Sequence, residues 1–173
     1  KKQVASKDAF KKETIKIESD KLIVEVSTEG GIVESVYLKE FKNYFNFASK
    51  TKKNKPLKLF GEKDGLNEFK FTSNGKVYNT GNKEFRVVKK SKSSITLAWS
   101  PEEGKELRYT YKLNPGKYDL AYSVSQEGLN VKDAAFIWKA ELKQTERLLS
   151  EQKRVSTVCY KYKGEDFDYL SEM

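Results

Sequence analysis

The chain has 173 residues, carries 34 Lys and Arg against 25 Asp and Glu, and contains one Cys and no His. This length fits one domain with a substantial core. The lack of His excludes catalytic triads, His-ligated zinc and His general bases, and a single Cys excludes an internal disulfide framework and Cys-rich metal sites. No apolar run approaches the length of a membrane span, so we expect the chain as given to be soluble.

The net charge of +9 rests on Lys, since only four of the 34 basic residues are Arg. Arg is favoured where phosphates and base edges are recognised, whereas Lys is usual on solvated faces. The densest Lys clusters fall in residues 50–55 and 89–92, in polar stretches typical of turns. We interpret them first as solvated loops and next as attraction to an anionic membrane surface, and we expect no nucleic-acid partner.

The first segments in chain order are a linker and a hairpin. Residues 1–12 are polar and Lys-rich, which predicts a linker ahead of a β-sandwich domain over residues 13–173. Apolar residues alternate over 22–26, which predicts a strand. Gly30 and Gly31 then predict a hairpin turn that needs positive φ, and they lack the spacing of a phosphate-binding loop.

An aromatic stretch follows the second strand, where the periodicity weakens. Its members are mixed with Asn and Lys: Phe41, Tyr44, Phe45 and Phe47. We expect these side chains either to line a groove or to cover a sheet edge.

The middle of the chain alternates strands and turns. Turn signals stand at residues 73–76 and at Asn114, Pro115 and Gly116. Apolar residues alternate with polar ones over 94–99, 106–113, 118–124 and 136–142. Four Tyr in the apolar phase of these strands are expected in the core: Tyr109, Tyr111, Tyr118 and Tyr122. Short strands with turns between them predict an all-β antiparallel sandwich.

One segment departs from this pattern. Residues 145–154 contain no β-branched residue after Thr145, which is a plausible N-cap. Glu146 stands in the first turn, and Lys153 and Arg154 stand in the last, an order that suits the helix dipole. We therefore predict one short helix here, before strand character resumes at Val155.

No residue pattern predicts a catalytic, cofactor or metal site. Cys159 lies in a predicted strand and is expected to be a buried, inert thiol, because a nucleophile would need a nearby His. The acidic cluster Glu165, Asp166 and Asp168 lacks the spacing of a calcium loop and is expected to be solvated. We therefore expect a protein that is not an enzyme.

Several segments, taken in order, resemble the large periplasmic domain of the YidC/Oxa/Alb family of membrane protein insertases. The stretch LIVEVSTEGGIVESVYL at 22–38 resembles its opening strands, and YTYKLNPGKY at 109–118 resembles its central hairpin. Further similar pieces are PLKLF at 56–60, residues 138–142, the helix after residue 145 and YKYKGEDFDYL at 160–170. The ordered set, rather than any one motif, indicates the N-terminal and central part of that domain.

This resemblance implies a supersandwich fold similar to mutarotase-like domains, whose enzymes use His residues that this chain lacks. It implies a periplasmic domain of an inner-membrane protein, truncated at its C-terminal end. The expected role is an interaction module that assists the insertion and folding of inner-membrane proteins, with the SecDF subunits of the Sec translocon and nascent membrane proteins as partners. The alternative from the residues is a carbohydrate-binding β-sandwich.

Overall fold

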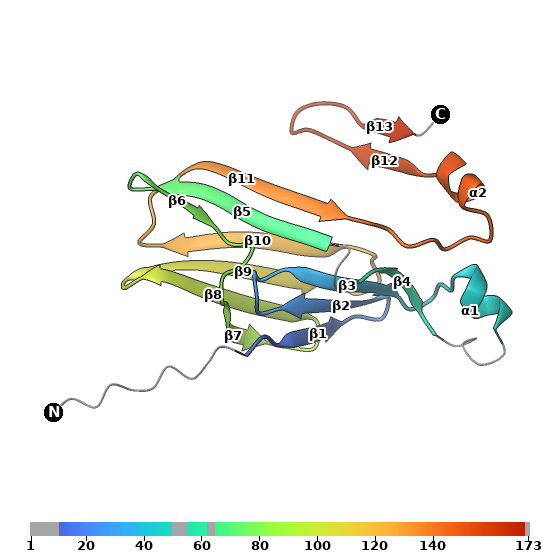
Figure 1. Cartoon of the computed structure of the whole chain (residues 1–173), viewed down its shortest axis with the longest axis horizontal. Helices are drawn as coiled ribbons and strands as arrows, with labels where there is room; N and C mark the ends of the chain where they lie inside the picture. The colour runs from blue at the N-terminus through green and yellow to red at the C-terminus, as the bar shows by residue number, and fades with distance from the viewer. Residues whose placement is uncertain (1–10, 50–54, 62–64, 172–173) are drawn as a thin grey trace.

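Thirteen antiparallel strands in four sheets make up most of the chain in the computed structural model, which describes residues 11–49, 55–61 and 65–171 (Figure 1). The first sheet has the order β1-β2-β3-β4 and contains β1 (Thr14–Glu18), β2 (Leu22–Ser27), β3 (Val33–Leu38) and β4 (Leu57–Phe60). The second has the order β10-β9-β8-β7 and contains β7 (Arg86–Lys90), β8 (Ser94–Glu102), β9 (Lys105–Leu113) and β10 (Leu120–Glu127). The third has the order β11-β5-β6 and contains β5 (Gly65–Ser73), β6 (Lys76–Asn79) and β11 (Val131–Ala140). The fourth is a hairpin of β12 (Thr157–Tyr160) and β13 (Asp168–Ser171).

Period-two alternation explains which face of each strand is buried. On β9 the alternate residues Leu107, Tyr109, Tyr111 and Leu113 are all buried, because successive side chains of a strand point to opposite faces. The same faces of β2 and β8 are buried as well, and together these side chains form one continuous core. This confirms the predicted all-β sandwich; no solved structure matches the chain, so the likeness to mutarotases stays a prediction.

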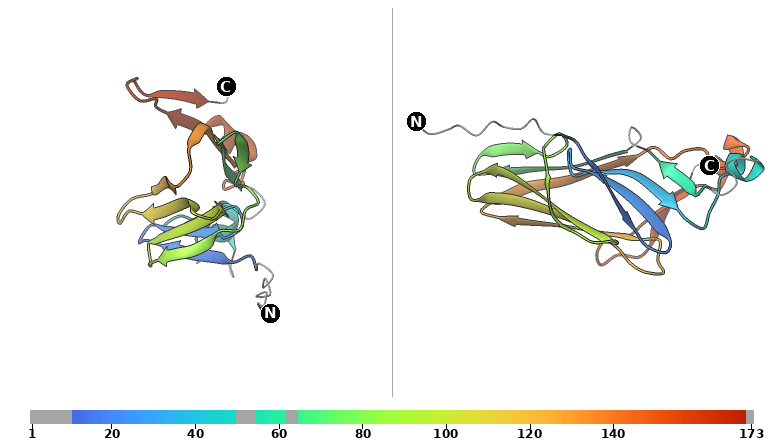
Figure 2. Two further views of the ribbon diagram at one scale, coloured as in Figure 1. Left: turned by 90° about the vertical axis from the view of Figure 1, so that its left-hand side faces the viewer. Right: turned by 90° about the horizontal axis from the view of Figure 1, so that it is seen from below.

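Polar contacts hold the three large sheets around that core. The Val33 N–H donates to Oδ1 of Asn67 at 2.9 Å, which joins the first sheet to the third. The Tyr109 hydroxyl donates to Oγ1 of Thr80 at 2.8 Å, which joins the second sheet to the loop after β6. Figure 2 gives two further views of this arrangement, in which the β12–β13 hairpin stands away from the sandwich.

The sequence-predicted turns lie between strands. Gly30 and Gly31 connect β2 to β3 with φ of +74° and +66°, in the left-handed region that favours glycine. Residues 73–76 close the β5–β6 hairpin, and Asn114, Pro115 and Gly116 fall between β9 and β10.

The described residues contain two short helices rather than one. The helix α2 (Leu149–Arg154) begins four residues later than Thr145, and its N-cap position is Leu148. The helix α1 (Tyr44–Ala48) was not predicted at all. No helix among the described residues is long and apolar enough to cross a membrane.

Candidate functional site

One end of the molecule carries both helices and is here called the helical tip: residues 41–49, Lys55 and residues 141–155 (Figure 1). The start of α1 is fixed by Asn43, whose Oδ1 accepts the N–H of Asn46 at 2.7 Å. An Asn side chain is a favoured N-cap because it satisfies an otherwise unpaired helix N–H. This cap stabilises the first turn of α1, in which the aromatic stretch is helical.

Gln152 folds the segment before α2 onto that helix. Its Oε1 accepts hydrogen bonds from the N–H of Thr145 at 2.7 Å, the Thr145 hydroxyl at 3.2 Å and the N–H of Glu146 at 3.2 Å. The Thr145 side chain therefore binds a residue inside α2 instead of capping its first turn. This contact is why the helix starts later than its sequence predicts.

The two halves of the helical tip are joined directly. The N–H of Tyr44 donates to the carbonyl of Thr145 at 2.7 Å, and the guanidinium of Arg147 lies 6.0 Å from the centre of the Tyr44 ring. The N–H of Leu57 donates to the carbonyl of Phe41 at 2.8 Å, which ties the segment before α1 to the start of β4. Segments a hundred residues apart in the sequence thus form one surface.

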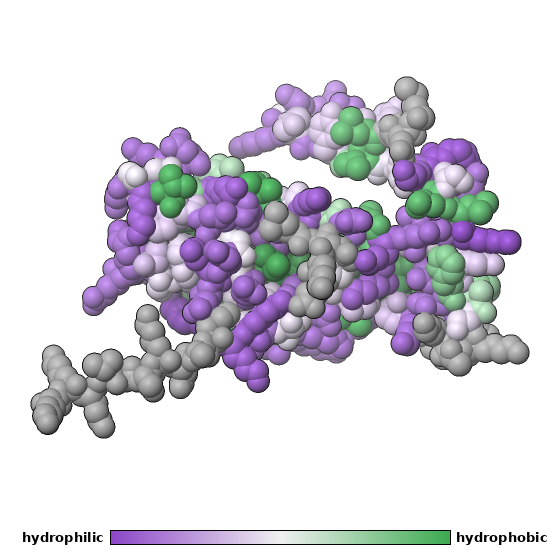
Figure 3. All heavy atoms as spheres, in the orientation of Figure 1, coloured by the Kyte–Doolittle hydropathy of each residue, from purple (hydrophilic) through white to green (hydrophobic). Residues whose placement is uncertain are grey.

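The helical tip exposes its apolar side chains. Neither α1 nor α2 buries a residue, and Phe47 is 68% exposed. Seven other large apolar side chains of the tip are exposed: Phe41, Tyr44, Phe45, Leu142, Leu148, Leu149 and Val155. Figure 3 shows apolar surface over α1 and α2, interrupted by hydrophilic side chains. The four aromatics singled out in the sequence therefore lie together, on α1 and the turn before it.

Tyr118 was expected in the core, but it is 46% exposed. Its hydroxyl donates to Glu40, and its ring contacts Phe41 edge-on with 5.6 Å between ring centres. The Lys21 ammonium, 2.6 Å from Glu40, and the Tyr118 hydroxyl hold the pKa of the Glu40 carboxyl below its ordinary value. Tyr118 lies between β9 and β10, outside both strands, and its contacts anchor the base of the tip.

A second surface, here called the open edge, is formed by β10 and β11. Each of these is the outermost strand of its sheet. The inward faces of these strands meet through Tyr122 and Phe136, whose ring centres lie 5.1 Å apart. Phe136 and Trp138 were expected in the apolar phase of their strand, yet Trp138 is 68% exposed and Phe136 about half exposed. Their cross-strand partners are Phe69 and Asn67, and Asn67 is buried. These aromatics therefore point toward the core side, at a margin of the sandwich that no described strand covers.

The remaining tyrosines of this region are structural. Burial raises the pKa of Tyr109 to about 12 and also raises the pKa of Tyr111, so both phenols stay protonated. The Tyr122 hydroxyl is buried without a hydrogen-bond partner of normal geometry. The Tyr109 and Tyr111 phenols act as hydrogen-bond donors, to Thr80 and to the Gly31 carbonyl.

The β12–β13 hairpin corrects another expectation. Cys159 is exposed rather than buried, because β12 pairs only with β13 among the described strands and no second layer packs on it. In the acidic cluster, Asp168 accepts a hydrogen bond from the Tyr160 hydroxyl at 2.6 Å, while Glu165 and Asp166 are exposed. No group of three metal-binding side chains occurs in the part of the chain that the structure describes.

Comparison with known proteins identifies the family. Residues 14–168 match the family model described as the YidC periplasmic domain. A membrane protein insertase YidC from Parabacteroides distasonis is 28% identical over 164 residues, which cover 90% of this chain and 25% of that protein. A second, from Bacteroides fragilis, is 27% identical over 161 residues, and a third, from Chloroherpeton thalassium, is 27% identical over 152. The chain spans about a quarter of the length of these curated relatives. The resemblance seen in the sequence is confirmed, together with the periplasmic setting: the chain belongs to the YidC periplasmic domain family.

Proposed function

We propose that this chain is the periplasmic interaction domain of a membrane protein insertase, that it is not a catalyst, and that it contacts extended polypeptide at the open edge. The relatives carry the name membrane protein insertase YidC, which supports the setting. The observation that carries the proposal is the pair Phe136 and Trp138, which face the core side of their sheet and are nevertheless exposed. Exposed aromatics at a sheet margin favour an added apolar partner.

The open edge offers main-chain groups as well as apolar surface. β10 pairs only with β9, and β11 only with β5, among the described strands. A strand at the edge of a sheet presents unpaired N–H and C=O groups, and an extended peptide can add to them as a further strand. Alternate side chains of that peptide would then contact Tyr122, Val124 and Phe136.

The proposed occupant is an extended apolar segment of a nascent membrane protein. A continuously apolar segment in extended form presents an apolar side chain at every second position, which suits the inward faces of β10 and β11. The SecDF subunits are a second proposed partner, supported by the family resemblance. Enrichment of SecDF periplasmic regions in a pull-down with the chain would support that partner, and their absence would remove it.

The test is binding of a fluorescent, alternating apolar peptide, measured by polarisation. Val124→Lys places a charge on the inward face of the edge strand and should abolish binding. Trp138→Ser should weaken it by about tenfold or more, because a large apolar contact is lost. The matched controls are Val77→Lys and Val77→Ser on β6, at the other edge of the third sheet, where Val77 is 74% exposed.

Two results would contradict the proposal. One is equal binding by the Val124→Lys variant and the unmodified chain. The other is strong binding by the chain and none by the longer protein, which would show that following strands of the same polypeptide occupy the open edge. The chain spans about a quarter of the length of its curated relatives, so a full-length protein of this family serves as the longer protein in the experiment.

A further inference from the structure

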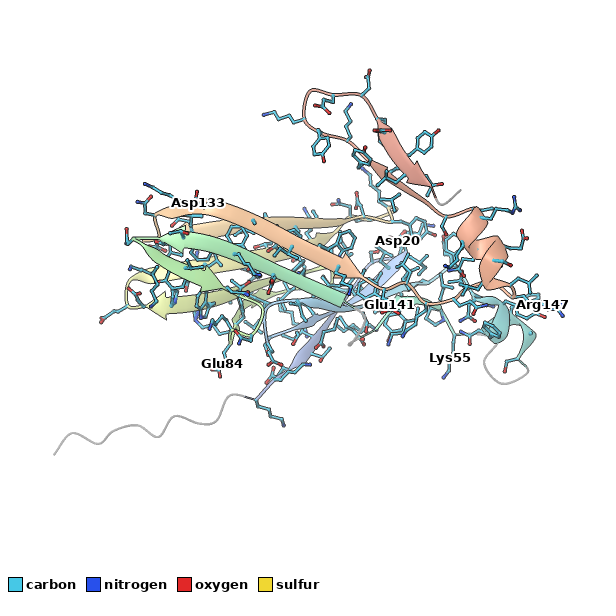
Figure 4. All side chains as sticks on the ribbon, turned by 45° about the horizontal axis from the view of Figure 1, so that its top comes forward. Asp20, Lys55, Glu84, Asp133, Glu141 and Arg147 are labelled. Atoms are coloured by element: carbon cyan, nitrogen blue, oxygen red, sulfur yellow. The ribbon has the colours of Figure 1, made fainter. Side chains whose placement is uncertain are left out.

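The helical tip combines exposed apolar side chains with excess positive charge. It carries six basic side chains and three acidic ones, a net charge of +3. The basic residues are Lys42, Lys55, Lys143, Arg147, Lys153 and Arg154, and the acidic ones are Glu141, Glu146 and Glu151. Figure 4 shows Lys55 and Arg147 at the end that holds both helices, whereas Asp133 lies at the opposite end. Apolar contact and cationic attraction are thus available at the same place.

The two helices need a partner for their apolar residues. Helices of five and six residues are marginal by themselves, because nucleation is unfavourable and short segments form few internal hydrogen bonds. Packing normally supplies the missing stability, yet neither α1 nor α2 buries a side chain in this chain. Asn43 and Gln152 fix the geometry of the tip, but they cover none of its Phe and Leu side chains.

Shape and composition favour a lipid surface over a protein groove. The tip projects at the end of the long axis of the molecule and is convex, so it suits a flat, deformable partner (Figure 1, Figure 2). Phe, Tyr and Leu beside Lys and Arg are the side chains that occupy the boundary between headgroups and acyl chains. Arg147 lies 6.0 Å from the centre of the Tyr44 ring, so on a bilayer the ring could enter the apolar layer while the guanidinium reaches a phosphate.

We propose that the helical tip docks on an anionic phospholipid bilayer, with Phe45, Phe47, Leu148 and Leu149 entering the interface. Its cationic side chains bind the lipid phosphates, which attract nearby Lys and Arg. This surface and this ligand are separate from the open edge and from polypeptide binding. The tip would set the orientation of the sandwich on the membrane and so the direction in which the open edge faces.

Vesicle flotation tests the proposal, with phosphatidylcholine vesicles and with vesicles that also contain phosphatidylglycerol. The chain should float with the anionic vesicles at low salt and much less at high salt, because salt screens exposed charges. Lys42→Gln combined with Lys55→Gln should weaken binding about 25-fold, at about fivefold for each charge near the surface. Phe45→Ser combined with Phe47→Ser should abolish flotation.

Matched controls come from β6 and from β7, the strand that carries the other Lys cluster. Lys89→Gln with Lys90→Gln removes two exposed charges of β7, and Val77→Ser with Val88→Ser removes two exposed apolar side chains. Both controls should float as the unmodified chain does. Equal losses in tip and control variants, or no preference for anionic vesicles, would overturn the proposal.

Peptide polarisation on the same variants separates the two proposals. The tip variants should bind the peptide normally, which also shows that they fold. Loss of flotation with peptide binding retained assigns the effect to lipid. Absence of peptide binding in every variant, with flotation intact, would remove the proposed polypeptide contact and leave lipid docking in place.

Discussion

The Tyr111 hydroxyl donates a hydrogen bond to the main-chain carbonyl of Gly31, with 2.7 Å between the two oxygens. The same hydroxyl accepts from Nδ2 of Asn67 at 2.9 Å, and Oδ1 of Asn67 accepts the N–H of Val33. One phenol from β9 therefore connects the β2–β3 turn and β5. The three large sheets meet at this buried point.

Tyr111→Phe should lower the free energy of unfolding by about 1–3 kcal/mol, because it leaves the Gly31 carbonyl and the Asn67 amide buried without their partner. Urea unfolding measures the change. Tyr118→Phe is the control, since it also removes one hydroxyl but at a half-exposed position, and it should cost less than about 1 kcal/mol. Equal losses in the two variants would argue against the buried network.

Gly31→Ala should destabilise the chain more than Gly75→Ala. Both glycines have positive φ, and the left-handed backbone costs an Ala about 1–2 kcal/mol at either position. A Cβ at Gly31 would also lie 2.7 Å from Cδ2 of Tyr109, whereas nothing lies within 4 Å of one at Gly75. Thermal unfolding of the two variants compares them, and similar midpoints would show that the Tyr109 ring moves aside freely.

The Glu102 carboxylate predicts a pH dependence of stability. Hydrogen bonds from Lys105, Tyr78 and Lys76 lower the pKa of Glu102 to about 2. Because the folded-state pKa lies below the unfolded value of 4.5, the stabilisation is present above pH 4.5 and is lost as the pH falls toward 2. Glu102→Gln should therefore be less stable than the unmodified chain at pH 7 and no less stable at pH 2. A difference that stays constant across this range would contradict the assignment.

Gln152→Ala should loosen the segment before α2 without unfolding the sandwich. The substitution removes the acceptor for the N–H groups of Thr145 and Glu146, which should then exchange with solvent deuterium faster. Glu151→Gln is the control, because it weakens the ion pair with Arg154 on the same helix and leaves that segment bonded. Unchanged exchange at the Thr145 N–H in the Gln152 variant would show that Gln152 does not hold this segment.

The strands and turns were predictable because their causes are local. Alternation decides which residues of β9 share a face, and a turn that needs positive φ calls for a glycine such as Gly31. Whether that face is buried cannot be predicted in the same way, because burial depends on another strand or sheet packing against it. Trp138 and Cys159 alternate like core residues and are exposed because no described strand covers them.

The helical tip was only partly predictable for a related reason. The four aromatics were singled out by their polar neighbours, but Tyr and Phe favour strands, and the Asn43 cap that makes them helical was missed. The start of α2 depends on the bond between Thr145 and Gln152. When a side chain such as Thr145 has two possible hydrogen-bond partners, the fold decides which one it takes, and the local sequence does not show it.

Because Cys159 is exposed, the β12–β13 hairpin can be labelled with a thiol reagent without any substitution. The chain has no other thiol, so a maleimide reacts at a single atom, on the part of the molecule that stands away from the sandwich. The rate of that reaction with and without lipid vesicles or peptide measures whether either partner covers the hairpin.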